Sequence, residues 1–143
     1  MKAEVFCVIY GVYPSGTVVP PHSHKDVEGL YAVSGELEVV REDSGRYRQI
    51  TAAAGDFVRI PSPMRHGMKN SSAEQAWVLF VTTERIGRFF ESVGKPIVNL
   101  MQVPVPWPER LRRFVEAAQQ YGFSLGSPND NAAAGLLIGE SVP

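Results

Sequence analysis

The sequence predicts an all-β fold, a sandwich or barrel, followed by a short helical arm. From Ala3 to about Val81, short β-rich stretches are broken by Gly, Pro and Asp/Ser clusters about every ten residues, which is typical of such folds. Beyond Thr82 the apolar period changes to that of a helix. At 143 residues the chain has the size of one domain and can bury a sizeable core.

Short alternating runs separated by turn residues define the expected strands. Asp43-Ser44-Gly45 stands between two such runs, where a hairpin turn is expected. The expected strands are Val5–Tyr13, Gly16–Pro20, Gly29–Val33, Glu36–Arg41, Tyr47–Thr51, Asp56–Ile60, His66–Asn70 and Gln75–Thr82.

Two amphipathic helices are expected after the barrel. In the first, Ile86, Phe89, Phe90 and Val93 recur at helical spacing, and Gly94 is placed to end it. A proline-rich linker, residues 103–107, leads into the second, which starts at Pro108 and closes at Gly122; its apolar stripe is Leu111, Phe114, Val115, Ala118 and Tyr121.

The expected organisation is a barrel of residues 1–82 and an arm and tail of residues 83–143 packed on it as part of the same domain. The arm could be a lid over the barrel mouth, with Phe89, Phe90 and Trp107 as its roof. It could instead cover the outer face of a sheet or form a dimer contact, and covering a sheet or a dimer seam is the favoured interpretation. The last stretch, Ser127 to Pro143, lacks periodicity and is expected to be partly mobile.

The charge balance excludes some classes of partner. With 14 basic and 15 acidic residues, no strong field is available for nucleic acid or an acidic membrane. The apolar run Val5 to Val12 is too short for a typical span and has no cleavage pattern behind it. The single cysteine, Cys7, fits a reducing compartment. We therefore expect a cytoplasmic protein without nucleic-acid or membrane partners.

All three histidines and one glutamate fall into one ordered pattern. His22 and His24 are separated by one residue, so in a strand both imidazoles reach the same point. Glu28 follows a short turn, and His66 follows the rigid stretch Ile60-Pro61-Ser62-Pro63. Each residue alone is more often structural or solvated. Together they suit one divalent transition metal, Fe, Mn, Ni, Cu or Zn, with one or two coordination positions left open.

This pattern resembles the cupin superfamily, in particular its small single-domain barrels. The first cupin motif, G-x5-H-x-H-x3-E-x6-G, is met by Gly16, His22, His24, Glu28 and Gly35. The second, G-x5-P-x-G-x2-H-x3-N, is met by Gly55, Pro61, His66 and Asn70, with Pro63 in place of the usual glycine. Because proline cannot adopt left-handed geometry, the turn before His66 is expected to differ in detail.

The resemblance implies a double-stranded β-helix, or jelly-roll barrel, with His22, His24, Glu28 and His66 as metal ligands at its mouth, and frequent homodimers. The helical segment from Thr83 to Pro96 and the helix ending near Tyr121 are similar to quercetin dioxygenase-like cupins, although this segment carries no nameable catalytic residue. A long apolar strand near the terminus, Val5 to Tyr13, also favours a homodimer, because an exposed edge of that kind is usually paired or covered.

Strand alternation predicts an apolar pocket wall at the metal. Leu30, Val58, Ile60 and Met68 fall on inward registers, whereas Arg59 points to solvent; plain core packing is the competing interpretation. The absence of Lys or Arg on these registers favours an apolar or phenolic substrate over a phosphate or small dicarboxylate. Aromatic residues of the strands could line the pocket or simply pack: Tyr31, Phe57, Trp77 and Phe80.

The leading functional hypothesis is a metal-dependent oxygenase of the quercetin dioxygenase type acting on a small flavonol- or polyketide-like substrate. Glu28 would be the catalytic base or a fourth ligand, depending on whether desolvation or the cation dominates its pKa. One alternative is a non-oxidative cyclase or isomerase that uses the metal as a Lewis acid. Another is a non-catalytic metal-dependent binding or sensing module.

Overall fold

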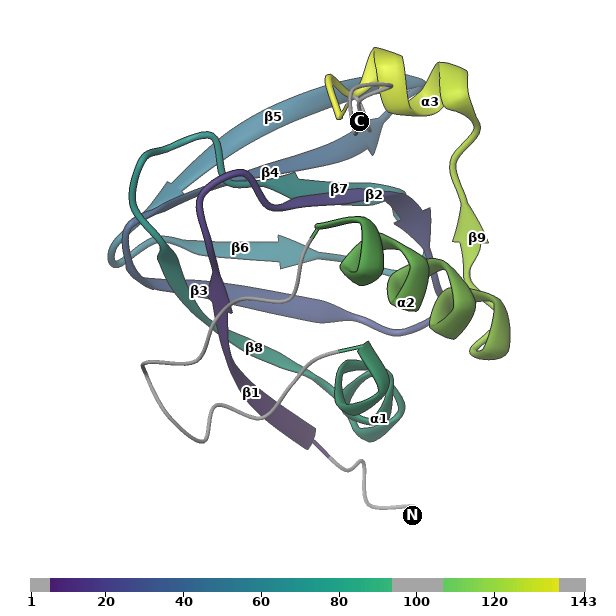
Figure 1. The fold of residues 1–143 in the computed structure, drawn as a ribbon, viewed down its shortest axis with the longest axis horizontal. Coiled ribbons are helices and arrows are strands. Elements are labelled where there is room, and N and C mark those ends of the chain that lie inside the picture. The colour runs from purple at the N-terminus through teal and green to yellow at the C-terminus, as the bar shows by residue number, and fades with distance from the viewer. Residues whose placement is uncertain (1–5, 94–106, 137–143) are drawn as a thin grey trace.

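The computed structural model describes residues 6–93 and 107–136, whose strands form two antiparallel sheets (Figure 1). One sheet has the order β1-β8-β3-β6 and the other the order β5-β4-β7-β2-β9. The strands are β1 Phe6–Tyr13, β2 Val18–Ser23, β3 Glu28–Ser34, β4 Glu36–Asp43, β5 Arg46–Ala53, β6 Phe57–Ile60, β7 His66–Lys69, β8 Ala76–Thr83 and β9 Ser124–Leu125. The predicted all-β barrel or sandwich is confirmed.

The main core fills the space between the sheets. Alternate residues of β3, β4 and β8 are buried, since successive side chains of a strand point to opposite faces. Apolar side chains of these strands and of β5, β6 and β7 pack into one cluster, which contains Leu30, Ala32, Leu37, Val39, Ala52, Val58, Ile60, Met68, Ala76, Val78 and Phe80.

The hairpin expected at residues 43–45 forms between β4 and β5. Asp43 pairs with Arg46 across a two-residue turn. Both turn residues have positive φ, 52° at Ser44 and 80° at Gly45, which is the conformation of a type I′ turn. This turn matches the twist of the strands and fixes the register of the whole β4-β5 pair.

Helix α1 (Glu84–Val93) continues directly from β8, and helix α2 (Trp107–Gln120) packs beside it at one end of the barrel (Figure 1). Their apolar faces meet in a second cluster formed by Ile86, Phe89, Ala117, Ala118 and Phe123. The two predicted helices are confirmed. Most of the predicted linker, residues 103–106, and the side chain of Trp107 lie outside the described residues.

The tail, which was expected to lack periodicity and to be partly mobile, contains a short helix that the sequence analysis did not predict. Ser127 and Asp130 form a reciprocal capping box at the start of α3 (Pro128–Ala133), with proline in its first turn. Behind this helix, Ala134 and Leu136 are buried against Val40. The S-P-x-D signature was readable, but helical periodicity cannot be detected in six residues. Residues 137–143 lie outside the described residues.

None of the helices in residues 6–93 and 107–136 has the length and apolar character needed to cross a membrane.

Candidate metal centre

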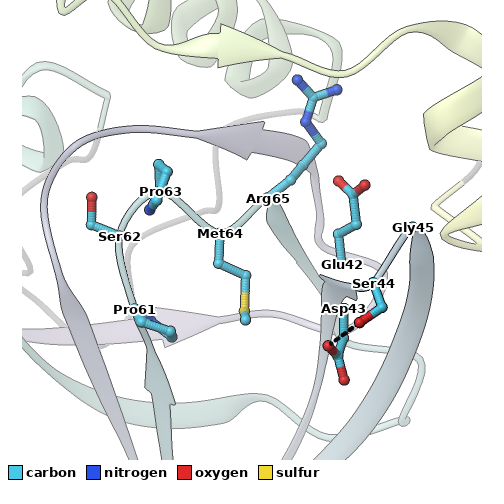
Figure 2. A pocket seen from close by; sticks show the side chains of 9 residues that line it. All are labelled: Glu42, Asp43, Ser44, Gly45, Pro61, Ser62, Pro63, Met64 and Arg65. Carbon is cyan, nitrogen blue, oxygen red and sulfur yellow. Dashed lines mark hydrogen bonds between the residues drawn. The ribbon is translucent and has the colours of Figure 1, made fainter.

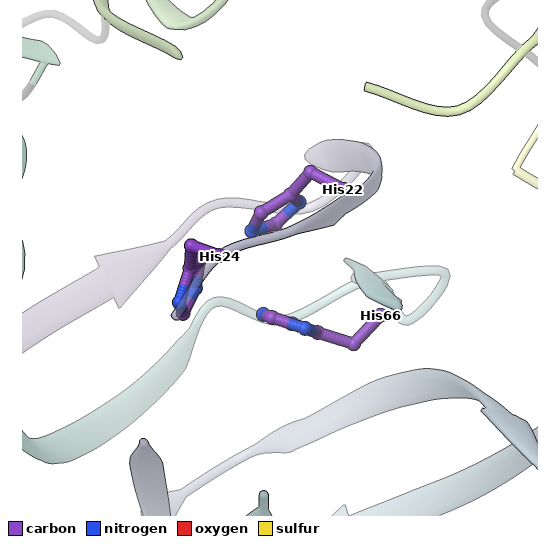
Figure 3. A group of neighbouring side chains, drawn as sticks. All are labelled: His22, His24 and His66. Atoms are coloured by element: carbon purple, nitrogen blue, oxygen red, sulfur yellow. The ribbon is translucent and has the colours of Figure 1, made fainter. Parts of the chain in front are cut away.

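The three histidines meet at one end of the barrel (Figure 3). His22 lies near the end of β2, His24 in the following loop, and His66 is the first residue of β7. Their ring centroids are 4.3 Å apart for His22 and His66, 5.1 Å for His24 and His66, and 5.6 Å for His22 and His24. All three are buried, and one nitrogen of each lies within 4.8 Å of the others. They could therefore hold a metal ion.

Convergence of His22 and His24 does not depend on a regular strand. The register of β2 against β7 shifts between Val19 and His22, and His22 then pairs with His66. The expected strand Gly16–Pro20 was therefore too short, since β2 runs to Ser23 with an irregularity in the middle. Such irregularities re-aim side chains, and here both imidazoles reach the same point.

Backbone carbonyls orient each imidazole. The Nδ1 atoms of the three rings lie 2.8 to 3.1 Å from the carbonyl oxygens of Pro20, Asp26 and Met64, respectively for His22, His24 and His66. A carbonyl oxygen can only accept, so Nδ1 must carry the hydrogen in each pair. In the neutral ring Nε2 then has a free lone pair, which is the tautomer that a metal ligand needs.

Burial keeps His22 and His24 neutral. Desolvation, aided by the nearby His66, holds the pKa of His22 well below its ordinary value. Desolvation also lowers the pKa of His24, although the Glu28 carboxylate opposes this change. Neutral imidazoles are the form that binds a metal without first losing a proton.

Glu28, the first residue of β3, adds a carboxylate to this cluster. Its Oε1 lies 3.6 Å from Nε2 of His24, and its Oε2 lies 3.2 Å from Nε2 of His66. Both Nε2 atoms are buried, and neither has a hydrogen-bond partner in the described part of the chain. In the neutral tautomers lone pairs then face carboxylate oxygens, an arrangement that is unfavourable unless a cation lies between them. The residues thus fit a bound metal.

Two further residues belong to the surroundings of the candidate centre, Tyr13 and Asn70. Burial, together with the Glu28 carboxylate, raises the pKa of Tyr13 far above its ordinary value, so its hydroxyl stays neutral. Asn70, the last residue of the second motif, is buried and donates to the carbonyls of Tyr13 and Glu74. Asn70 therefore links the end of β1 to the loop before β8, and these hydrogen bonds do not involve the histidines. The turn that leads to His66 contains a cis peptide bond between Ser62 and Pro63.

The arm covers the histidines. Phe123 stacks on His22 with ring centroids 5.7 Å apart and planes 7° from parallel, and lies 4.7 Å from His24. Phe114 of α2 meets His22 edge-on at 5.2 Å. Strand β9 pairs with β2 at His22 itself, opposite Leu125. The sequence favoured an arm that covers a sheet or a dimer seam and did not predict this position over the histidines. Helical periodicity shows that a helix has an apolar face, but it does not show which surface that face contacts.

The residues expected on inward registers are indeed buried. Leu30, Val58, Ile60 and Met68 are at most 5% exposed and belong to the main core, whereas Arg59 is exposed. Of the four strand aromatics considered, Phe80 is in this core. Tyr31 and Phe57 are instead 41% and 60% exposed, so they line no interior pocket.

A separate depression of about 390 Å³ lies between the β4-β5 hairpin and the segment before His66 (Figure 2). In Figure 2 the only hydrogen bond among its side chains joins the Ser44 hydroxyl to Asp43. Its lining contains none of the three histidines and consists of Glu42, Asp43, Ser44, Gly45, Pro61, Ser62, Pro63, Met64 and Arg65.

The fold and the site define the chain as a β-barrel in which three buried histidines could hold a metal. The Cupin domain family matches residues 9–82, just over half of the chain. The chain therefore belongs to the cupin family. The comparison with curated protein sequences found no significant match.

Solved cupin-like structures are similar over the barrel. A variant of oxalate decarboxylase from B. subtilis is 26% identical, with a TM-score of 0.52, over 57% of this chain and 22% of that one. The protein TT1209 from Thermus thermophilus is 25% identical, with a TM-score of 0.50, over 58% of this chain and 76% of that one. The chain thus spans only about a fifth of the oxalate decarboxylase.

Proposed function

We propose that this protein is a cytoplasmic, metal-dependent cupin oxygenase that acts on a small apolar or phenolic substrate of flavonol or polyketide type. The observation that carries the proposal is the set of buried, partnerless Nε2 atoms facing the Glu28 carboxylate. His22, His24 and His66 would hold the metal, with Glu28 beside it. When bound, a transition metal with open positions supplies Lewis-acid and redox chemistry to a substrate.

The surroundings of the site favour an apolar substrate. Within residues 6–93 and 107–136, no lysine or arginine is fully buried, and the partly buried Arg65 and Arg85 are already paired with Asp130 and Asp26. The core beside the histidines is aliphatic and aromatic. A small dianion such as oxalate would lack a buried cation other than the metal itself. Oxalate decarboxylase is described as having Mn(II) centres, so the similarity to it supports a metal site on this barrel more than it supports that substrate. Leu30, Val58, Ile60 and Met68 are the proposed pocket wall.

Glu28 is the proposed catalytic base. It is 5% exposed and is the one carboxylate within 4 Å of two of the histidine Nε2 atoms in the described residues. A hydroxyl of the substrate in this space would lie within reach of Oε1 or Oε2, and Glu28 would accept its proton. The aromatic cover formed by Phe114 and Phe123 would exclude water from the reacting atoms.

Dioxygen uptake with a panel of flavonols and catechols tests the activity. Uptake that depends on the substrate and on metal supports the oxygenase. Product without dioxygen uptake would point instead to the cyclase or isomerase, in which only Lewis-acid chemistry is used. Tight ligand binding with neither product nor uptake would favour the sensing module.

We also propose a homodimer through the outer face of the β1-β8-β3-β6 sheet. The exposed large hydrophobic residues of the described chain all lie on this sheet or directly before β3: Phe6, Val8, Tyr10, Val27, Tyr31, Val33, Phe57 and Val81. Together they expose on the order of 600–700 Å², near the roughly 800 Å² that each partner buries in a stable complex. Arg59 is the one charged side chain on the outward registers of β3 and β6, so two copies would meet with little repulsion.

A further inference from the structure

Arg85, in the first turn of α1, bonds to two segments that are distant in sequence. Its Nε and Nη2 donate to Oδ2 of Asp26 at 3.0 and 2.6 Å. Its Nη1 donates to the backbone carbonyl of Tyr121 at 2.6 Å. Asp26 lies in the loop between His24 and Glu28, and Tyr121 directly follows α2. One guanidinium on α1 therefore joins the candidate ligand loop to the segment that follows α2.

On the side of the loop, this contact bears on His24. Asp26 is buried, and its second carboxylate oxygen accepts from the Thr83 hydroxyl at 2.7 Å. Its backbone carbonyl accepts from Nδ1 of His24 at 3.1 Å. Arg85 and Thr83 hold the Asp26 side chain from two sides. They thereby also hold the Asp26 backbone carbonyl, which determines the tautomer and the orientation of the His24 ring. Groups of this kind around a metal site control its affinity.

On the side of the arm, the contact bears on Phe123. Gly122 has a φ of 70°, which lets the chain reverse after α2, and the amide of Phe123 then donates to the carbonyl of Ala118. The Phe123 ring lies over His24 and within 5.7 Å of the Arg85 guanidinium carbon. Arg85 thus supports this ring both through the Tyr121 carbonyl and through a cation–π contact.

We propose that Arg85 is a positioning residue that couples closure of the aromatic cover to the geometry of His24. The inference rests on the proposed metal centre. When α2 and the residues that follow it are closed over the site, Arg85 on α1 holds Asp26 and Tyr121 together. When α2 moves to admit a substrate, Arg85 loses its bond to Tyr121 and with it one of the contacts that keep it on Asp26. Metal binding and arm closure therefore strengthen each other, because linkage between two such events is reciprocal.

The test compares Arg85→Ala and Arg85→Lys with Arg88→Ala as a matched control. Arg88 is on the same helix but is exposed, and among the described residues its ion pair is with Glu84 at the surface. Zn²⁺ affinity is measured by competition with a chelator. Arg85→Ala should raise the Kd for Zn²⁺ by roughly 10–100-fold. Arg85→Lys should lose less, since an ammonium can pair with Asp26 but lacks the planar fork that reaches both partners. Arg88→Ala should match the parent.

Hydrogen exchange in the metal-free protein gives a second, independent measurement. Arg85→Ala should speed exchange of the amides of residues 121–125, whereas Arg88→Ala should not. Unchanged exchange there, or a Zn²⁺ affinity equal to that of the parent, would overturn the coupling. If the parent itself binds no Zn²⁺, the proposed metal centre fails, while the exchange experiment still shows whether Arg85 holds the arm.

Asp26→Asn keeps the size of the side chain and guards against a variant that fails to fold. If Arg85 acts on His24 through Asp26, combining Asp26→Asn with Arg85→Ala should weaken Zn²⁺ binding no more than the stronger single change. Fully additive losses would mean that Arg85 acts on the metal by another route and would contradict the proposal.

Discussion

At the scale of single residues, the candidate site is recognised by buried nitrogen atoms that lack a hydrogen-bond partner among the described residues. Each imidazole is held by a backbone carbonyl at Nδ1, yet Nε2 of His24 and of His66 has no partner. Burying polar atoms without a hydrogen bond costs free energy, and a ligand bound to these atoms would offset that cost. Glu28 faces both of them, so its role can be separated from theirs by substitution.

We predict that Glu28→Gln retains much of the metal but loses turnover. The amide is nearly the same shape and can still ligate through its oxygen, but it cannot accept a proton from a substrate hydroxyl at neutral pH. Metal content by mass spectrometry and steady-state turnover, measured on the same preparation, check this. Complete loss of metal would instead make Glu28 chiefly a ligand.

At the scale of elements, α3 shows how local chemistry can stabilise a segment that has no apolar period. Its start is held by Ser127 and Asp130, and Asp130 also pairs with Arg65 at 3.0 Å beside β7. The hydrogen bonds from Ser127 hold the pKa of Asp130 below its ordinary value, so the carboxylate stays charged at neutral pH. Behind it, Leu136 is fully buried and packs on Gly67, next to His66.

We predict that Ser127→Ala destabilises the protein by about 1 kcal/mol, because it removes the helix N-cap. Chemical denaturation should show an earlier midpoint with an unchanged slope. Asn129→Ala is the matched control, since Asn129 is exposed in the same helix and takes no part in the cap. Equal midpoints for the two variants would show that the capping box contributes nothing to stability.

The eight barrel strands, the hairpin turn at residues 43–45 and the two arm helices could be predicted because each depends on a local signal of period or turn chemistry, whereas the two-residue strand β9 carries no such signal. The convergence of His22, His24 and His66 could be predicted because their spacing matches a known motif. The position of Phe123 could not, because which surface an amphipathic helix covers is decided by tertiary packing. The outward position of Phe57 follows from the alternation that puts Val58 and Ile60 inward, but the contact of its ring with Gly29 on the neighbouring strand could not be read from the sequence.

At the scale of the whole molecule, the two faces of the β1-β8-β3-β6 sheet are both apolar. The inner face forms the core, and the outer face leaves Phe6 76% and Phe57 60% exposed. A patch of this extent is larger than is usual for a monomer. A single covering segment would protect about one strand width of roughly 5 Å, whereas the face is four strands wide. In the proposed homodimer, a second copy of the chain would cover the whole face.

We predict that the parent is a dimer and that Val8→Glu combined with Phe57→Glu yields a folded monomer. Charges placed in this face would be buried unpaired on association, which is costly. Light scattering across a wide concentration range measures the mass. Gln49→Glu, an exposed change on the other sheet, should remain dimeric. A parent that stays at monomer mass throughout, or a double variant that still dimerises, would refute the interface.

The proposed metal centre is checked by the metal content of protein purified without chelators or nickel affinity, for the parent and for His66→Ala. We predict about one transition-metal ion per chain in the parent. In His66→Ala we expect a sharp loss of metal with the circular dichroism of the barrel unchanged, because the main hydrophobic core does not include this side chain. Equal metal occupancy in the two proteins, or no metal in the parent even after incubation with each candidate ion, would contradict a metal site built on the three histidines.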